Sequence, residues 1–144
     1  MPLFRSTNGK DERMKSNLAQ LNLLLAWIGI LLGFISGSLL GLKFHREDWL
    51  GGYGSFKRRL YRLGHISFFG LAIVNLAFYF TAQKFLAAGL AASVASWGFV
   101  GGAVSMPICC FGMAHNAKLH ALFAIPVSSL LVGGILTLWE VIRL

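Results

Sequence analysis

Charged residues are scarce in this chain, and acidic residues are the scarcest. Only 12% of the 144 residues are charged, whereas soluble domains average about 25%. The acids number 5 against 13 Lys and Arg, which gives a formal net charge of +8. All the acids lie outside the long uncharged runs, at Asp11, Glu12, Glu47, Asp48 and Glu140. A proton pump or ion-coupled carrier that works through a carboxylate inside the membrane is therefore not expected.

The basic residues form short clusters between long uncharged runs. This pattern is typical of loops that face anionic lipid headgroups. A nucleic-acid-binding domain would need a basic face on a soluble surface, and no segment remains to form one. We therefore expect a lipid bilayer with anionic headgroups as a partner, and no nucleic acid.

Cysteine is nearly absent as well. The two that occur, Cys109 and Cys110, are adjacent within an apolar stretch, so they provide no disulfide framework. No spacing of Ser, Cys and His residues identifies a catalytic triad. Whether the protein is an enzyme stays open, and the residues favour one that is not a stand-alone enzyme.

Long uncharged segments make up most of the remaining sequence: Leu21–Leu42, Leu63–Gln83, Phe85–Ala117 and Leu119–Trp139. A helix of about 20 residues crosses a hydrocarbon core of roughly 30 Å, so each segment predicts one crossing. We expect an all-α integral membrane four-helix bundle with both termini on the same side, in a prokaryotic cytoplasmic (inner) membrane. A polar basic tail, 1–20, precedes a single transmembrane domain, 21–144. The crossings are expected near 21–42, 63–82, 86–112 and 120–140.

Glycine, in contrast, is abundant, and the first crossing repeats it at intervals of four residues: Gly29, Gly33, Gly37 and Gly41. Residues four apart stack on one helix face, where small residues allow another helix to approach closely. This glycine ladder, a glycine zipper, predicts a packing face for either a neighbouring helix of the chain or a partner subunit. The third crossing is the expected internal partner, because it carries small residues of its own: Ala88, Ala92, Ser96, Gly98 and Gly102.

A cationic collar leads directly into the second crossing. Arg58, Arg59 and Arg62 lie in the collar, His65 lies at its border, and Asn75 lies near the middle of the crossing. Ionisable and amide groups inside a membrane are candidate functional residues by default.

The other three histidines are expected on the same membrane face as His65. His45 follows the first crossing, and His115 and His120 bracket the turn between the third and fourth. With four antiparallel crossings, the first and third loops lie on one side of the membrane. The sequence thus predicts a histidine-lined site near that face.

Two hypotheses place an organic cofactor there. A b-type haem would be held by His65 and either His115 or His120, because axial ligands lie at similar depth on facing helices of a bundle. The arginines of the collar would then bind its propionates. A quinone is the alternative, with His65 and either Asn75 or Ser67 as hydrogen-bonding groups.

Copper is a third hypothesis. Cys109, Cys110, Met113 and His115 fall close together in the sequence, and thiolate and thioether ligands favour Cu(I). No recognised metal-binding spacing is present, however. The remaining alternative is that no cofactor binds.

These residues favour a small accessory subunit or assembly factor of a membrane electron-transfer complex, with a haem b or quinone site near one face. Other membrane subunits are then expected as partners. One alternative is a cofactor-free structural subunit that docks a larger complex through the glycine ladder. Another is a small channel or carrier.

Overall fold

Helices account for the regular structure of the described chain. The computed structural model describes residues 5–85 and 89–144, with side chains described for residue 17 and from residue 19 onward. In chain order the elements are α1 (Arg5–Leu42), the short 3-10 helix η1 (Trp49–Gly51), α2 (Phe56–Ala82), α3 (Leu90–His115), the 3-10 helix η2 (Ala117–Phe123) and α4 (Ala124–Ile142).

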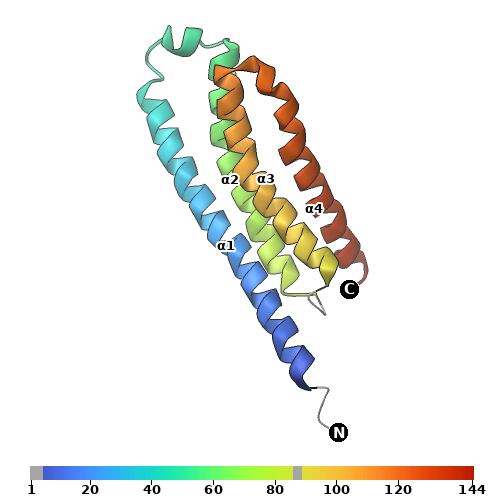
Figure 1. The fold of residues 1–144 in the computed structure, drawn as a ribbon. Coiled ribbons are helices and arrows are strands. Elements are labelled where there is room, and N and C mark those ends of the chain that lie inside the picture. The colour runs from blue at the N-terminus through green and yellow to red at the C-terminus, as the bar shows by residue number, and fades with distance from the viewer. Residues whose placement is uncertain (1–4, 86–88) are drawn as a thin grey trace.

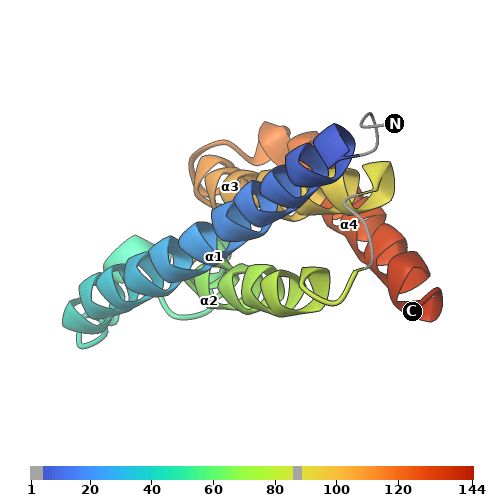
Figure 2. The same cartoon turned by 90° about the horizontal axis from the view of Figure 1, so that it is seen from below.

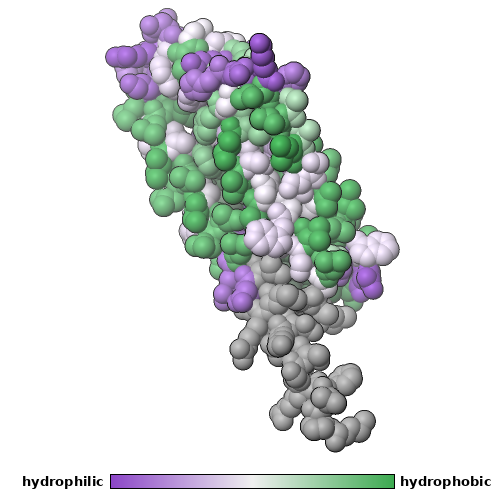
Figure 3. Space-filling model, viewed as in Figure 1, coloured by the Kyte–Doolittle hydropathy of each residue, from purple (hydrophilic) through white to green (hydrophobic). Residues whose placement is uncertain are grey.

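Four stretches are long and apolar enough to cross a membrane: Ala19–Leu42, Phe56–Ala82, Leu90–His115 and, from η2 and α4 together, Ala117–Ile142. At 1.5 Å per residue each is roughly 36–40 Å long, enough for a hydrocarbon core of about 30 Å. Figure 3 shows the corresponding band of apolar surface between two hydrophilic ends. The predicted all-α integral membrane four-helix bundle is confirmed.

The helix ends differ from those of the predicted crossings, and α4 begins at Ala124 instead of residue 120 because η2 precedes it. α1 begins at Arg5, within the region expected as a polar tail, although the side chains of residues 1–16 lie outside the described part. α2 begins at Phe56 instead of residue 63, because Ser55 caps it: the Ser55 hydroxyl accepts the Arg58 backbone N–H at 3.1 Å. α3 begins at Leu90 and continues to His115.

The helices pack in the order of the chain. α1 lies on α2, α2 on α3, and α3 on α4, and a smaller contact joins α1 to α3. Figure 1 shows that α1 begins and α4 ends at one end of the bundle, whereas η1 and η2 lie at the other. Seen from below, α1 runs obliquely across its neighbours (Figure 2).

The glycine ladder packs against α2. A Cβ atom on each of its first three glycines would come within 3.0 Å of atoms of Phe68, Phe69 and His65 respectively, whereas Gly41 has open space beside it. α2, and not the expected third crossing, is therefore the neighbour that these glycines admit. Ala88, one of the small residues named for the third crossing, lies outside the described residues.

The glycines of α3 face α4 instead. A Cβ atom on Gly98 would lie 2.8 Å from the Ser129 backbone oxygen and 3.2 Å from Gly133 Cα. The Ser129 hydroxyl donates to the Gly98 carbonyl oxygen at 2.8 Å. Close backbone approach through small residues is the usual way in which helices associate in lipid.

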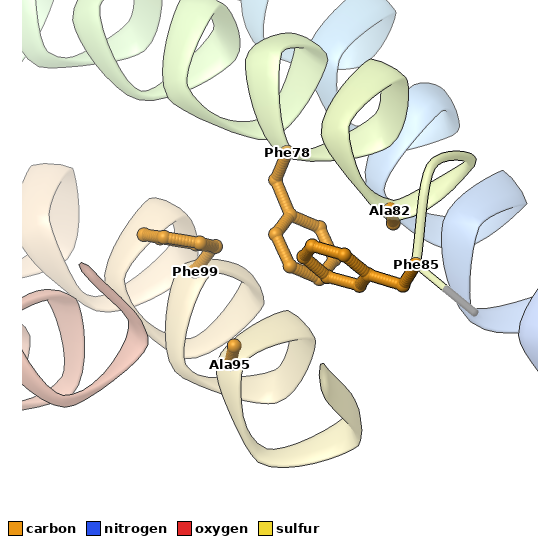
Figure 4. Packing of buried hydrophobic residues seen from close by; sticks show 5 residues of the cluster. All are labelled: Phe78, Ala82, Phe85, Ala95 and Phe99. Atoms are coloured by element: carbon orange, nitrogen blue, oxygen red, sulfur yellow. The ribbon is translucent and has the colours of Figure 1, made fainter. Parts of the chain in front are cut away.

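A small aromatic core lies between α2 and α3 near their connecting turn (Figure 4). Its members are Phe78, Ala82, Phe85, Ala95 and Phe99. The Phe78 and Phe99 ring centroids are 5.3 Å apart. This core fixes the end of the bundle opposite the histidines.

Candidate functional site

Three of the four histidines make side-chain hydrogen bonds, each with a different part of the molecule. His65 lies in the first half of α2, His115 ends α3 and His120 lies in η2. These parts of the helices lead towards the end of the bundle that carries η1 and η2 (Figure 1). His65, in α2, turns towards α1: its Nδ1 hydrogen-bonds with the Ser36 hydroxyl at 2.9 Å. A Cβ atom on Gly37 would lie 2.8 Å from His65 Cε1 and 3.4 Å from Nε2, so the ring lies directly against the α1 backbone. The missing side chain of Gly37 makes this position possible.

His115, the last residue of α3, bonds to α2. Its Nε2 lies 3.0 Å from the Tyr61 hydroxyl, and the imidazole itself is exposed. The Tyr61 ring packs edge-on against Phe111 and Trp49, with centroids 5.4 Å and 6.3 Å away. These contacts hold the phenol at the meeting point of α2, α3 and the first loop.

A cavity of about 260 Å³ lies beside these two pairs, and we call it the interfacial cavity. Its lining residues come from α1, η1, α2 and α3: Ser36, Leu39, Leu40, Lys43, Trp49, Tyr61 and Phe111. Ser36 and Tyr61 are both in this lining. The Tyr61 hydroxyl is hydrogen-bonded to His115, and the Ser36 hydroxyl is hydrogen-bonded to His65 and donates to the Gly33 carbonyl oxygen at 3.1 Å. The wall of the cavity is almost entirely apolar and partly aromatic, and two of its lining residues carry hydroxyls that are hydrogen-bonded to histidines.

A second hollow of about 260 Å³, the membrane groove, lies deeper between α1 and α3, with α2 as its floor. Apolar residues and glycine form its lining: Leu25, Ile28, Gly29, Leu32, Phe68, Leu71, Ala72, Ala103, Val104, Pro107, Ile108 and Phe111. Phe111 lines both spaces. On α1, Leu32 in the groove and Ser36 in the cavity are one helical turn apart on the same face.

The remaining histidines are exposed. His120 lies in η2, and its Nδ1 contacts the Ala117 carbonyl oxygen of its own turn at 3.4 Å. His45 lies in the first loop. Neither lines the interfacial cavity or the membrane groove.

The arrangement does not fit a haem with two histidine ligands. His65 lies against α1, His115 bonds to Tyr61 of α2, and His120 folds back on its own turn. Facing axial ligands would need a shared space between two of these rings, and no histidine lines either cavity.

The residues proposed for copper also diverge. The Cys109 thiol donates to the Leu122 carbonyl oxygen at 3.5 Å, towards η2, whereas Cys110 is fully buried and packs near Gly64 of α2. Met113 is partly buried on α3. Within the described residues, no group of three or more His, Cys, Asp and Glu side chains could hold a metal ion. This donor set does not fit a copper centre.

The three arginines of the collar differ sharply in environment. Arg58 is only 3% exposed, and its guanidinium is surrounded by aromatic rings of the first loop. Arg62 is partly buried and lies over the Tyr53 ring, with its Cζ 4.7 Å from the centroid. Arg59 is exposed. Arg58 and Arg62 are thus packed against aromatic rings, whereas Arg59 carries a solvated charge.

Asn75 lies away from the interfacial cavity, in a fully buried network that links three helices. Asn22 Nδ2 donates to Asn75 Oδ1 at 2.8 Å, and the Ser96 hydroxyl donates to Asn22 Oδ1 at 2.5 Å. Asn75 Nδ2 also donates to the Leu71 carbonyl oxygen at 2.8 Å. Asn75 therefore cross-links α1, α2 and α3 and does not line the candidate site.

Three residues that line the interfacial cavity, Ser36, Trp49 and Tyr61, and the network residue Asn22 were not among the predicted site residues. Asn22 had a usable signal, because an amide stands at the start of an apolar run. Ser36 and Tyr61 had none, since serine and interfacial tyrosine are ordinary residues in membrane helices.

Comparison with known proteins finds no matching family model, no similar curated protein and no similar solved structure.

Proposed function

We propose that this protein is a small accessory subunit or assembly factor of a membrane electron-transfer complex, and that it binds a quinone in the interfacial cavity. One observation carries the proposal. Ser36 and Tyr61 both line the same cavity, and the hydroxyl group of each is hydrogen-bonded to a histidine ring.

A quinone matches this pair of groups chemically. Its two carbonyl oxygens lie on opposite sides of one flat ring, and each takes up a proton when the ring is reduced by two electrons. The Ser36 hydroxyl donates to the Gly33 carbonyl oxygen at 3.1 Å, so towards His65 Nδ1–H it can act as an acceptor. On binding it would turn from Gly33 and donate to one quinone carbonyl. The Tyr61 hydroxyl would donate to the other, with His115 behind it. Because His115 is exposed, it can exchange protons with water.

The membrane groove supports the same proposal. Membrane quinones carry an apolar isoprenoid chain, and the groove is an apolar space that shares Phe111 with the interfacial cavity. A chain leaving the cavity past Phe111 would enter the groove between α1 and α3. The aromatic walls formed by Trp49 and Phe111 suit the flat ring itself.

The glycine ladder gives less support to the alternative of a docking subunit. Three of its four glycines already admit atoms of α2, so only Gly41 remains open for a partner. In the proposed role, the electrons for quinone reduction come from a partner subunit. Other membrane subunits, in a quinone-containing membrane such as a prokaryotic cytoplasmic membrane, are therefore part of the proposal.

Fluorescence of Trp49 provides a direct test, because quinones quench nearby indole rings and Trp49 lines the cavity. A variant that keeps only Trp49, with Trp27, Trp97 and Trp139 changed to Phe, would be titrated in lipid nanodiscs with a short-chain ubiquinone and a menaquinone analogue. We expect saturable quenching. In that background Tyr61→Phe should weaken binding about fivefold, because one net hydrogen bond contributes about 1 kcal/mol.

Matched controls separate binding from partitioning into lipid. Tyr79→Phe removes a phenol hydroxyl from the other half of α2, and Ser128→Ala removes an exposed hydroxyl from α4. Both should leave the titration unchanged. Quenching that never saturates, or that Tyr61→Phe and Tyr79→Phe affect equally, would contradict a quinone in this cavity.

A further inference from the structure

Arg58 is a buried cation in an aromatic cage. Its Cζ lies 5.3 Å from the ring centroid of Phe44, 5.6 Å from that of Trp49 and 5.2 Å from that of Tyr53. Only 3% of the residue is exposed. Aromatic faces attract a cation, but they do not neutralise its charge or accept the hydrogen bonds of its N–H groups in the way that an anion does.

No anion of the described chain pairs with Arg58. Its guanidinium makes neither an ion pair nor a hydrogen bond with the residues that the structure describes. Glu47 and Asp48, the acids of the same loop, are exposed and do not reach it. Among the described residues no fully enclosed side-chain nitrogen lacks a hydrogen-bond partner, so the unpaired guanidinium nitrogens of Arg58 reach the surface although most of the residue is buried. A largely desolvated cation without a counter-charge is costly, so an anion from outside the chain that binds these nitrogens is indicated.

A second guanidinium shares the cage. Arg62 lies one helical turn after Arg58, and its Cζ is 4.7 Å from the same Tyr53 ring. Two cations at this spacing repel each other. An anion held between them would make the net electrostatic interaction of the three groups attractive. The planar Arg guanidinium is well suited to bind phosphate oxygens through two hydrogen bonds.

The position of the cage identifies the anion as a phosphate at the membrane surface. The cage lies in the first turns of α2, where the helix emerges from the apolar band of Figure 3 into the hydrophilic end. Trp49 and Tyr53 are typical of the headgroup level, and Lys57 and Arg59 add positive charge beside the cage. The N-terminus of α2 adds a further partial positive charge.

We propose that Arg58 and Arg62 form a specific site for the phosphate of an anionic membrane lipid. This site is distinct from the quinone proposal and does not depend on it, although Trp49 belongs to both. The lipid phosphate lies against the two guanidiniums, and its acyl chains lie along the apolar surface below the collar. A phosphate monoanion with no compensating choline is favoured, since the two guanidiniums place two positive charges at the site.

Lipid titrations of the full chain test the proposal. The purified protein in a neutral detergent would be titrated with phosphatidylglycerol and phosphatidylcholine, with bound lipid counted by native mass spectrometry. We expect tighter binding of phosphatidylglycerol, weakened fivefold or more by Arg62→Gln and by Arg58→Gln. Arg58→Lys, which keeps the charge and loses the planar guanidinium, should also weaken it. Arg62 is partly exposed, so Arg62→Gln keeps the test valid if changes at Arg58 disturb folding.

Arg59→Gln is the matched control, because it removes the same charge from an exposed neighbour that makes no ring contact in the described structure. It should change phosphatidylglycerol binding less than twofold. Equal losses from Arg59→Gln and Arg62→Gln would mean diffuse surface charge and would overturn the proposal, as would equal binding of the two lipids. A parallel titration with inorganic phosphate distinguishes the source of the anion. If millimolar inorganic phosphate displaces the lipid, and this displacement depends on Arg62, the ligand of the site is a free phosphate and not a lipid.

Discussion

Amide and hydroxyl groups link three helices in a region that water does not reach. Asn22, Asn75 and Ser96 are all fully buried, and each finds its hydrogen-bond partners within the network or on the backbone. In hydrocarbon an unpaired amide is costly, so these side chains favour one relative placement of α1, α2 and α3 over slipped alternatives. At the residue scale, polar pairing sets the register of the first three helices.

A double-mutant cycle tests this pairing. Asn75→Leu should lower the free energy of unfolding by about 1 kcal/mol or more, because it leaves the Asn22 amide without its acceptor. The double variant Asn22→Leu/Asn75→Leu should be less destabilised than the sum of the two single variants. Unfolding in increasing mole fractions of a denaturing detergent provides the measurement. Thr81→Val removes an exposed hydroxyl from α2 and serves as a control. Strict additivity of the single changes would show that the two amides are not coupled.

At the scale of the elements, two different pairs of helices use glycine for two different contacts. The ladder of α1 admits α2, including the His65 ring beside Gly37, whereas Gly98 and Gly133 bring α3 and α4 into backbone contact. The first contact therefore positions a residue of the candidate site, and the second fixes α4 to the rest of the bundle. Glycines therefore admit side chains of α2 at the first contact and allow backbone contact at the second.

Gly98→Ala should destabilise the α3–α4 contact. The added Cβ atom would lie 2.8 Å from a backbone oxygen of Ser129, and backbone cannot move aside as a flexible side chain can. Overpacking of this kind costs about 1–3 kcal/mol. Gly134→Ala adds the same atom to open space on the neighbouring helix, so it should leave the unfolding free energy unchanged or slightly raised. Equal stability of the two variants, measured by detergent unfolding, would show that α3 and α4 do not approach this closely.

The whole molecule divides into two ends with different properties. One end carries η1, η2, the histidines, the collar and the interfacial cavity, and the other carries the aromatic core and the end of α4 (Figures 1 and 4). Between them lies an apolar surface that suits lipid. Both proposed ligands, the quinone ring and the lipid phosphate, belong to the same end, which is therefore one membrane face.

Cysteine labelling tests this division. His45→Cys, in the exposed first loop, and a cysteine added after Leu144 should react with a membrane-impermeant thiol reagent from opposite sides of sealed vesicles. The native Cys109 and Cys110 lie within α3 and would be changed to Ser to remove their background. Labelling of both positions from the same side would contradict four crossings.

Most of the architecture could be predicted because the bilayer imposes it. An uncharged run of about 20 residues in a membrane protein forms a crossing helix in most cases. An even number of crossings then puts both termini on one side of the membrane and both histidine-bearing loops on the other. The helix ends were less predictable. α2 begins well before Leu63, because the polar stretch after Ser55 continues the helix out of the apolar segment.

By itself, the sequence determined that this is an integral membrane protein of four helices, with its histidines, collar and glycine ladder on known segments. Only the tertiary structure decided that the ladder meets α2, that His65 and His115 turn to different partners, and that Ser36 and Tyr61 share a cavity. The physical reason is that a membrane helix is apolar on every side. Its pattern shows that a face can pack closely, but the partner of that face depends on the three-dimensional fit of all four helices.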